Sequence, residues 1–133
     1  MSKIFTKKFK EESQVSLVVS DNGLKIVTDE GDIELSDHHY QDCCESVYAD
    51  WSVAENYVNQ LKDKFGEIEI RGVAEDGFII AFGGYYATSL SKIFIPCYNS
   101  QNGYYSSGLT LEIRENGKTE THDISEYVED RID

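Results

Sequence analysis

The chain has 133 residues, of which 40% are hydrophobic and 12% aromatic, and its 25 acidic and 12 basic side chains give a net charge of −13. This length suits one domain over residues 1–133 that buries its own core, and the composition excludes a disordered chain. No stretch approaches the roughly 20 apolar residues that span a bilayer. We expect a cytoplasmic protein, in the cytosol of a host cell, with no membrane partner.

The charge is unevenly distributed along the chain. Four of the nine lysines fall within residues 1–10, which contain no acid, so the rest of the chain carries 25 acidic against eight basic side chains. Such a field repels a phosphate backbone and favours a basic partner, including a protein surface that normally holds DNA. Its alternative role is to keep the protein soluble. Three cysteines, two of them adjacent, do not form a secreted disulfide framework and indicate a reducing compartment.

The first third of the chain predicts a β-meander. Residues 1–12 are a basic arm or an edge strand, and residues 15–19 alternate apolar with polar side chains. Asp21-Asn22-Gly23 is typical of a type I′ turn, because Asn and Gly accept positive φ. Return strands follow over residues 24–28 and 33–35.

One amphipathic helix is predicted over residues 53–65. Ser52 and Glu55 have the spacing of a capping box, in which both side chains satisfy free backbone N–H groups of the first turn. Apolar side chains then recur at helical spacing as far as Phe65, and Gly66 suits the position after the helix.

Further strands are predicted over residues 68–73, 78–82, 90–98, 109–113 and 119–124. The apolar run 78–82 is the best candidate for a central strand, and Asn116-Gly117 turns the last hairpin. The predicted fold class is therefore α+β: a mostly antiparallel sheet of about seven or eight strands with one amphipathic helix packed on it.

Residues 37–48 have the highest density of reactive side chains, with two of the three histidines and two of the three cysteines. Thiolate, imidazole and carboxylate groups are ligands for zinc and other transition metals. The candidate metal ligands are His39, Asp42, Cys43, Cys44 and Glu45. In an extended segment, however, neighbouring side chains point to opposite faces, which would place His38, Asp42 and Cys44 on one face and His39, Cys43 and Glu45 on the other.

Two other interpretations of this segment remain open. Cys43 or Cys44 could be a nucleophile activated by His38 or His39, although nearby carboxylates raise rather than lower a thiol pKa. Alternatively the cysteines are buried core residues and the segment is a structural junction between a loop and a strand.

The segment His39-x-Gln41-Asp42-Cys43-Cys44-Glu45-x-Val47-Tyr48, with the later Asn102-Gly103-Tyr104-Tyr105-Ser106, resembles an uncharacterised family of small phage-associated proteins. Members carry a His-x-x-Asp-Cys-Cys-Glu-x-Val segment and a later Ser-Asn-Gly-Tyr-Tyr-Ser segment. The resemblance covers roughly residues 37–113 and implies that the two motifs lie together in space. Phe94-Ile95-Pro96 departs from the Ile-Arg-Trp that often precedes the second motif.

Small size, acidity and this resemblance together lead to a functional expectation. We expect a non-enzymatic accessory protein of a phage or mobile element, without a cofactor, that binds and inhibits a host protein with a basic surface. A nucleic-acid-handling defence enzyme such as a CRISPR nuclease is the natural candidate, and acidic side chains would imitate DNA. The alternative is a metal- or small-ligand-binding domain. Exposed acids and tyrosines supply the expected partner-binding residues: Asp29, Glu30, Asp32, Glu34, Asp37, Tyr104, Tyr105, Glu126, Glu129 and Asp130.

Overall fold

The fold is known from a computed structural model that describes residues 2–38, 47–61, 63–83, 91–99 and 108–130. Its strands are β1 (Ser2–Ser20), β2 (Gly23–Thr28), β3 (Gly31–His38), β4 (Val47–Ala49), β5 (Lys64–Val73), β6 (Gly77–Phe82), β7 (Lys92–Asn99), β8 (Thr110–Glu115), β9 (Lys118–Asp123) and β10 (Glu129–Asp130). Two short 3-10 helices are described, η1 (Trp51–Tyr57) and η3 (Ser125–Tyr127).

In these residues ten strands form one sheet, in the order β10-β7-β6-β5-β1-β2-β3-β8-β9, with β4 paired to β7. Every described pairing except β10 with β7 is antiparallel. The predicted mostly antiparallel sheet, broadly α+β, is confirmed, but the short 3-10 helix η1 takes the place of the predicted amphipathic helix, and η3 is a second short 3-10 helix. The sheet has more strands than the seven or eight predicted.

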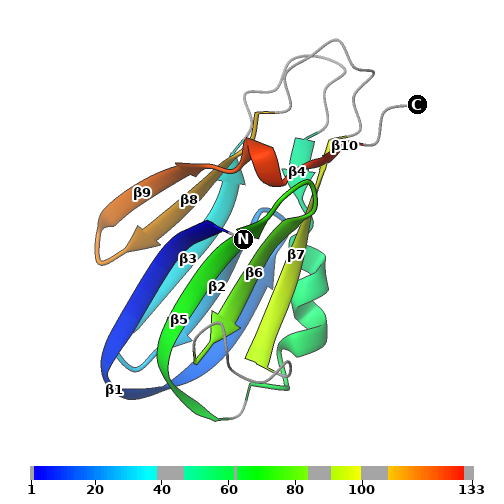
Figure 1. The fold of residues 1–133 in the computed structure, drawn as a ribbon. Helices are drawn as coiled ribbons and strands as arrows, with labels where there is room; N and C mark the ends of the chain where they lie inside the picture. Colours follow the sequence, from blue (N-terminus) through cyan, green and yellow to red (C-terminus); the bar gives the residue numbers. More distant parts are fainter. Residues whose placement is uncertain (1, 39–46, 62, 84–90, 100–107, 131–133) are drawn as a thin grey trace.

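The long strand β1 joins the two halves of the sheet. Its first half pairs with β5 and its second half with β2, and the strand bends between them (Figure 1). The β1–β5 register shifts between Lys8 and Ser13, where β1 has extra residues that bulge out of the ladder. Residues 2–12 are therefore part of a central strand and not a basic arm or an edge strand.

Buried and exposed side chains alternate along the strands, so that one face of each half of the sheet packs into a common core. In β2 and β3 the buried side chains are those of Leu24, Ile26, Ile33 and Leu35, and the residues between them along each strand are more exposed. The run predicted to be central, 78–82, does lie between β5 and β7, with Phe78, Ile80 and Phe82 fully buried. Inward residues of both halves belong to one hydrophobic cluster.

The predicted helix begins earlier and ends earlier than expected. Its cap is Asp50, whose carboxylate accepts the Ser52 backbone N–H, so Ser52 lies inside the first turn. Phe65 belongs to β5, where its ring packs 5.7 Å from that of Phe82. Phe65, an apolar residue of the strand that follows the helix, lies at helical spacing from the apolar residues before it, and this is why the predicted helix is too long.

Both predicted tight hairpins form, with one correction. Asn116 and Gly117 adopt positive φ (51° and 77°) between β8 and β9, as a type I′ turn requires. Asp21 and Asn22 also make a two-residue connection, but neither has positive φ. Gly23 is needed instead because β3 lies against it: a Cβ there would be 2.1 Å from the Leu35 carbonyl oxygen.

In the part of the chain that the structure describes, no helix is long and apolar enough to cross a bilayer.

Candidate functional site

The predicted metal ligands His39, Asp42, Cys43, Cys44 and Glu45 lie outside the described residues, as do Tyr104 and Tyr105. The structure therefore tests neither the metal site nor the proximity of the two motifs. Within the described ranges, no group of three or more His, Cys, Asp and Glu side chains is arranged to hold a metal ion.

Asp37, at the end of β3, ties together the elements that flank this segment. Its Oδ2 accepts a hydrogen bond from the backbone N–H of Ala49 (2.9 Å), and its Oδ1 accepts one from the indole Nε1 of Trp51 (2.8 Å). Both carboxylate oxygens are thus used inside the fold. Asp37 connects β3 to β4 and η1, a structural role that differs from the predicted contact with a partner.

Cys97 in β7 is fully buried. Burial, together with the negative charge of Asp37, raises the pKa of its thiol to about 12. The thiol is therefore protonated at neutral pH, which is the weakly nucleophilic form.

The predicted acidic residues of the β2–β3 hairpin have partners within the protein. Glu30 Oε2 accepts the backbone N–H of Lys10 (2.8 Å), and Asp29 Oδ2 accepts that of Gln14 (2.9 Å). The hydroxyl of the buried Ser13 donates to neither carboxylate; it accepts a hydrogen bond from the backbone N–H of Asp29 (2.8 Å). These bonds satisfy backbone groups that the β1 bulge removes from the ladder.

The other two acids of this hairpin lie in exposed ion pairs. Asp32 lies 3.4 Å from the Lys25 ammonium, and Glu34 lies 3.7 Å from the Arg114 guanidinium. Each pair contributes little to stability because water screens it, but within each pair the basic side chain offsets the negative charge that a partner would meet.

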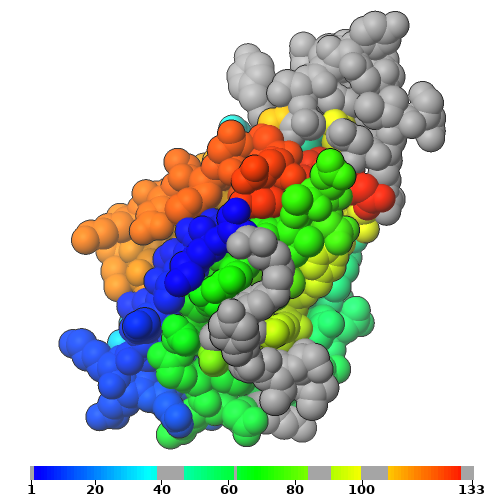
Figure 2. Space-filling view, viewed as in Figure 1, coloured from blue at the N-terminus to red at the C-terminus, as the bar shows by residue number. Residues whose placement is uncertain are grey.

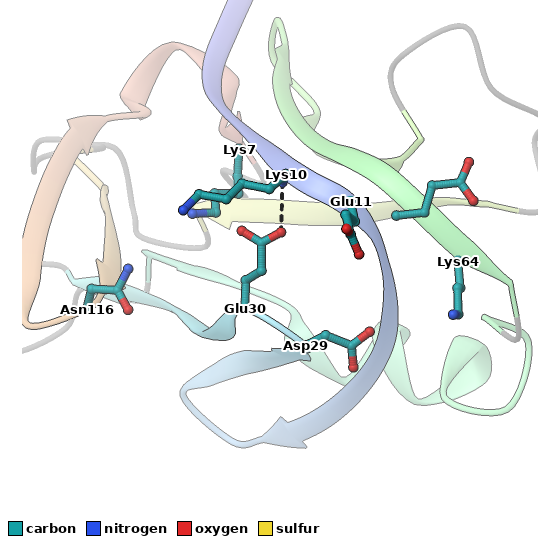
Figure 3. A pocket seen from close by; sticks show the side chains of 8 residues that line it. Lys7, Lys10, Glu11, Asp29, Glu30, Lys64 and Asn116 are labelled. Carbon is teal, nitrogen blue, oxygen red and sulfur yellow. Dashed lines mark hydrogen bonds between the residues drawn. The ribbon is translucent and has the colours of Figure 1, made fainter.

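A hollow of about 730 Å³ lies beside the β1 bulge (Figure 3). Lys7 and Lys10 lie on one side, Lys64 lies with Glu11 and Asp29 on the other, and Glu30 is between them. Glu12 and Asn116 complete the lining. Lys7 is further bound to Glu115 by an ion pair of 3.0 Å. This hollow mixes both signs of charge and does not form a surface of one sign.

A second group of carboxylates lies at the end of the sheet away from the β1 bulge. The β5–β6 turn carries Glu75 and Asp76, η3 carries Glu126, and β10 carries Glu129. Backbone bonds join these segments: the Glu75 N–H donates to the Glu126 carbonyl (2.9 Å), and the Cys97 N–H donates to the Asp76 carbonyl (3.1 Å). Figure 2 shows the red η3–β10 segment against the green β5–β6 turn. We call Glu75, Asp76, Glu126 and Glu129 the acidic end.

Tyr127 anchors the acidic end to the core. Its ring lies directly against Gly72 of β5, where an added Cβ would be 2.2 Å from the ring carbon Cζ. Burial raises the pKa of the Tyr127 phenol, which therefore stays neutral. Because only glycine admits the ring at this distance, Gly72 determines where η3 sits.

The acidic end meets a pair of tyrosines. Tyr98 of β7 is the register partner of both Tyr48 in β4 and Glu129 in β10. The two tyrosine rings lie 5.7 Å apart at 58°, and Tyr48 is 39% exposed. An exposed tyrosine that packs against a half-buried one beside a carboxylate is typical of a protein-binding surface.

Comparisons with protein-family models, curated proteins and solved structures found no match.

Two residues of the acidic end, Glu126 and Glu129, are among the partner-binding residues expected from the sequence; the Asp130 side chain lies outside the described residues. Glu75 and Asp76 were missed, because a local pattern identifies them only as a turn. Tyr48 was missed as well, although its position between two inward residues of a short strand places it on the surface.

Proposed function

We propose that this protein is a non-enzymatic binding module that presents its acidic end to a basic surface of another protein. The proposal includes the expected setting: an accessory protein of a phage or mobile element that inhibits a nucleic-acid-handling defence enzyme, such as a CRISPR nuclease. The resemblance of residues 37–48 and 102–106 to a phage-associated family supports that setting.

One contrast carries the proposal. In the β2–β3 hairpin, each predicted acid is bound to a backbone N–H group or to a basic side chain. At the acidic end, Glu75, Asp76 and Glu126 are exposed, and none forms an ion pair with a basic side chain that the structure describes. Carboxylates left without a counter-charge are the ones that a basic partner can neutralise at least cost.

The net charge extends the effect of this surface. At −13 the whole molecule attracts a basic partner from a distance, which raises the association rate and makes it sensitive to salt. A groove that normally holds a phosphate backbone has the complementary field. The carboxylates would occupy such a groove in place of phosphates.

The test compares two variants with equal loss of charge. One neutralises the acidic end (Glu75→Gln, Asp76→Asn, Glu126→Gln), and the matched control neutralises exposed acids elsewhere (Glu11→Gln, Glu12→Gln, Asp63→Asn). Binding to a panel of purified nucleic-acid-handling defence enzymes, and inhibition of their cleavage, is measured at low and high salt. We expect the first variant to bind about tenfold more weakly than the control, since each exposed charge contributes up to about 1 kcal/mol.

Three outcomes would contradict the proposal. The first is that the native protein binds no enzyme of the panel at low salt. The second is an affinity that does not change with salt, and the third is an equal loss of binding in both variants.

A further inference from the structure

A second, smaller hollow lies where the β1–β2 hairpin meets β4 and the start of η1. Its volume is about 200 Å³, below the roughly 300–1,000 Å³ of sites for drug-sized ligands. Its lining residues include Tyr48, Trp51, Asp21, Asp50 and Glu55, and none of the lining residues is basic. The hollow at the β1 bulge, by contrast, contains three lysines.

The two aromatic residues of the lining, Tyr48 and Trp51, are held in place by contacts with neighbouring side chains. Trp51 is 1% exposed, its indole N–H is bound by Asp37, and its ring meets Phe78 edge-on with centroids 5.6 Å apart. Tyr48 is supported by the ring of Tyr98. Tyr48 is therefore the aromatic side chain that a ligand can reach, beside a space too small for a cofactor but large enough for the end of one side chain.

The carboxylates around this space retain unused acceptors. Asp50 uses Oδ1 to cap η1, accepting bonds from the Ser52 backbone N–H (3.2 Å) and hydroxyl. Asp21 and Glu55 are exposed, and neither carboxylate has a hydrogen bond or ion pair with another described residue. The hollow thus combines an aromatic wall with unneutralised negative charge, which is complementary to a cationic group.

We propose that this hollow receives an arginine side chain of the partner. Guanidinium is planar, so it can stack on the Tyr48 ring and donate in pairs to carboxylate oxygens, whereas a lysine ammonium is a more strongly hydrated point charge. The inference rests on the proposed function only for the origin of the arginine, a basic protein. The chemistry of the hollow itself is independent of the acidic end.

The test uses N-acetyl-L-arginine amide as the probe and N-acetyl-L-citrulline amide as its neutral counterpart of nearly identical shape. Trp51 is the only tryptophan of the chain and lines this hollow, so its indole N–H resonance and its fluorescence are assigned without ambiguity and respond to changes there. We expect the arginine probe to shift the Trp51 resonance in a saturable manner and the citrulline probe to leave it unchanged. Equal shifts with both probes, or no shift with arginine, would overturn the proposal.

Variants separate this site from the acidic end. We expect Glu55→Gln and Asp21→Asn each to weaken arginine binding about fivefold, and the control Glu75→Gln to leave it unchanged. Unchanged arginine binding in the double variant Asp21→Asn/Glu55→Gln would also overturn the proposal. If the hollow binds arginine but no basic protein is captured, the proposed function alone fails; if a captured partner ignores Asp21 and Glu55, the arginine site alone fails.

Discussion

Replacing Gly72 by alanine tests how the acidic end is anchored. The new Cβ would lie 2.2, 2.3 and 2.5 Å from three carbons of the Tyr127 ring, closer than such atoms ever approach. Since the contact is with the body of a buried ring, the whole ring must move. Overpacking of this kind costs about 1–3 kcal/mol, and partial exposure of a tyrosine that is now 5% exposed adds to it.

We therefore expect Gly72→Ala to lower the free energy of unfolding by about 3 kcal/mol, a large part of the stability of a typical domain. Urea unfolding followed by Trp51 fluorescence measures it, with an expected fall in midpoint of more than about 1 M. Gly66→Ala is the matched control in the same strand, because nothing lies within 4 Å of a Cβ there. Its expected change is within about 0.5 kcal/mol.

A double-mutant cycle isolates the contact. If the ring of Tyr127 is the obstacle, Gly72→Ala should cost almost nothing in a Tyr127→Ala background. Simple additivity of the two substitutions, or equal effects of alanine at positions 72 and 66, would refute this explanation of the anchor.

Two further substitutions test other contacts. Asp37→Ala should lower the free energy of unfolding by about 2–4 kcal/mol and shift Trp51 emission to longer wavelength, because it removes both charge-assisted hydrogen bonds of this carboxylate. The control Asp32→Ala breaks only an exposed ion pair and should lower the free energy of unfolding by less than about 1 kcal/mol. Equal losses in the two variants would contradict the structural role assigned to Asp37. Burial tends to raise the pKa of Glu69, but hydrogen bonds and charges from Arg71 and Lys3 outweigh it and hold the pKa below its ordinary value. The stabilisation from Glu69 is therefore complete above the pKa of an unfolded glutamate and is lost as the pH falls through the lowered value, so the unfolding free energies of the native protein and Glu69→Gln should converge in acid; a constant difference would contradict this.

Patterns within a few residues predicted much of the fold. The alternation in β2 and β3, the positive-φ pair Asn116-Gly117 and the apolar run of β6 depend on neighbouring residues alone. The role of residues 2–12, by contrast, cannot be predicted from neighbouring residues alone. Their lysines resemble a solvated arm, and only pairing with β5, some 60 residues away, makes them a central strand.

The candidate site shows the same division. Acidity near the C-terminus identified Glu126 and Glu129, but the contact that brings Glu75 and Asp76 beside them is a backbone bond between a turn and a 3-10 helix. Asp37 resembled other exposed acids until Trp51 was found to donate to it. Such roles depend on tertiary contacts, which no local spacing reveals.

The double pairing of β1 has a kinetic consequence. Its second half meets β2 through a two-residue turn, a closure expected within microseconds, whereas its first half must find β5 across a loop of more than 40 residues. The bulge at residues 9–12 lies at the boundary between these two events. We therefore expect the β1–β3 meander to form first, and the N-terminal lysines and Phe5 to remain solvated until β5 arrives.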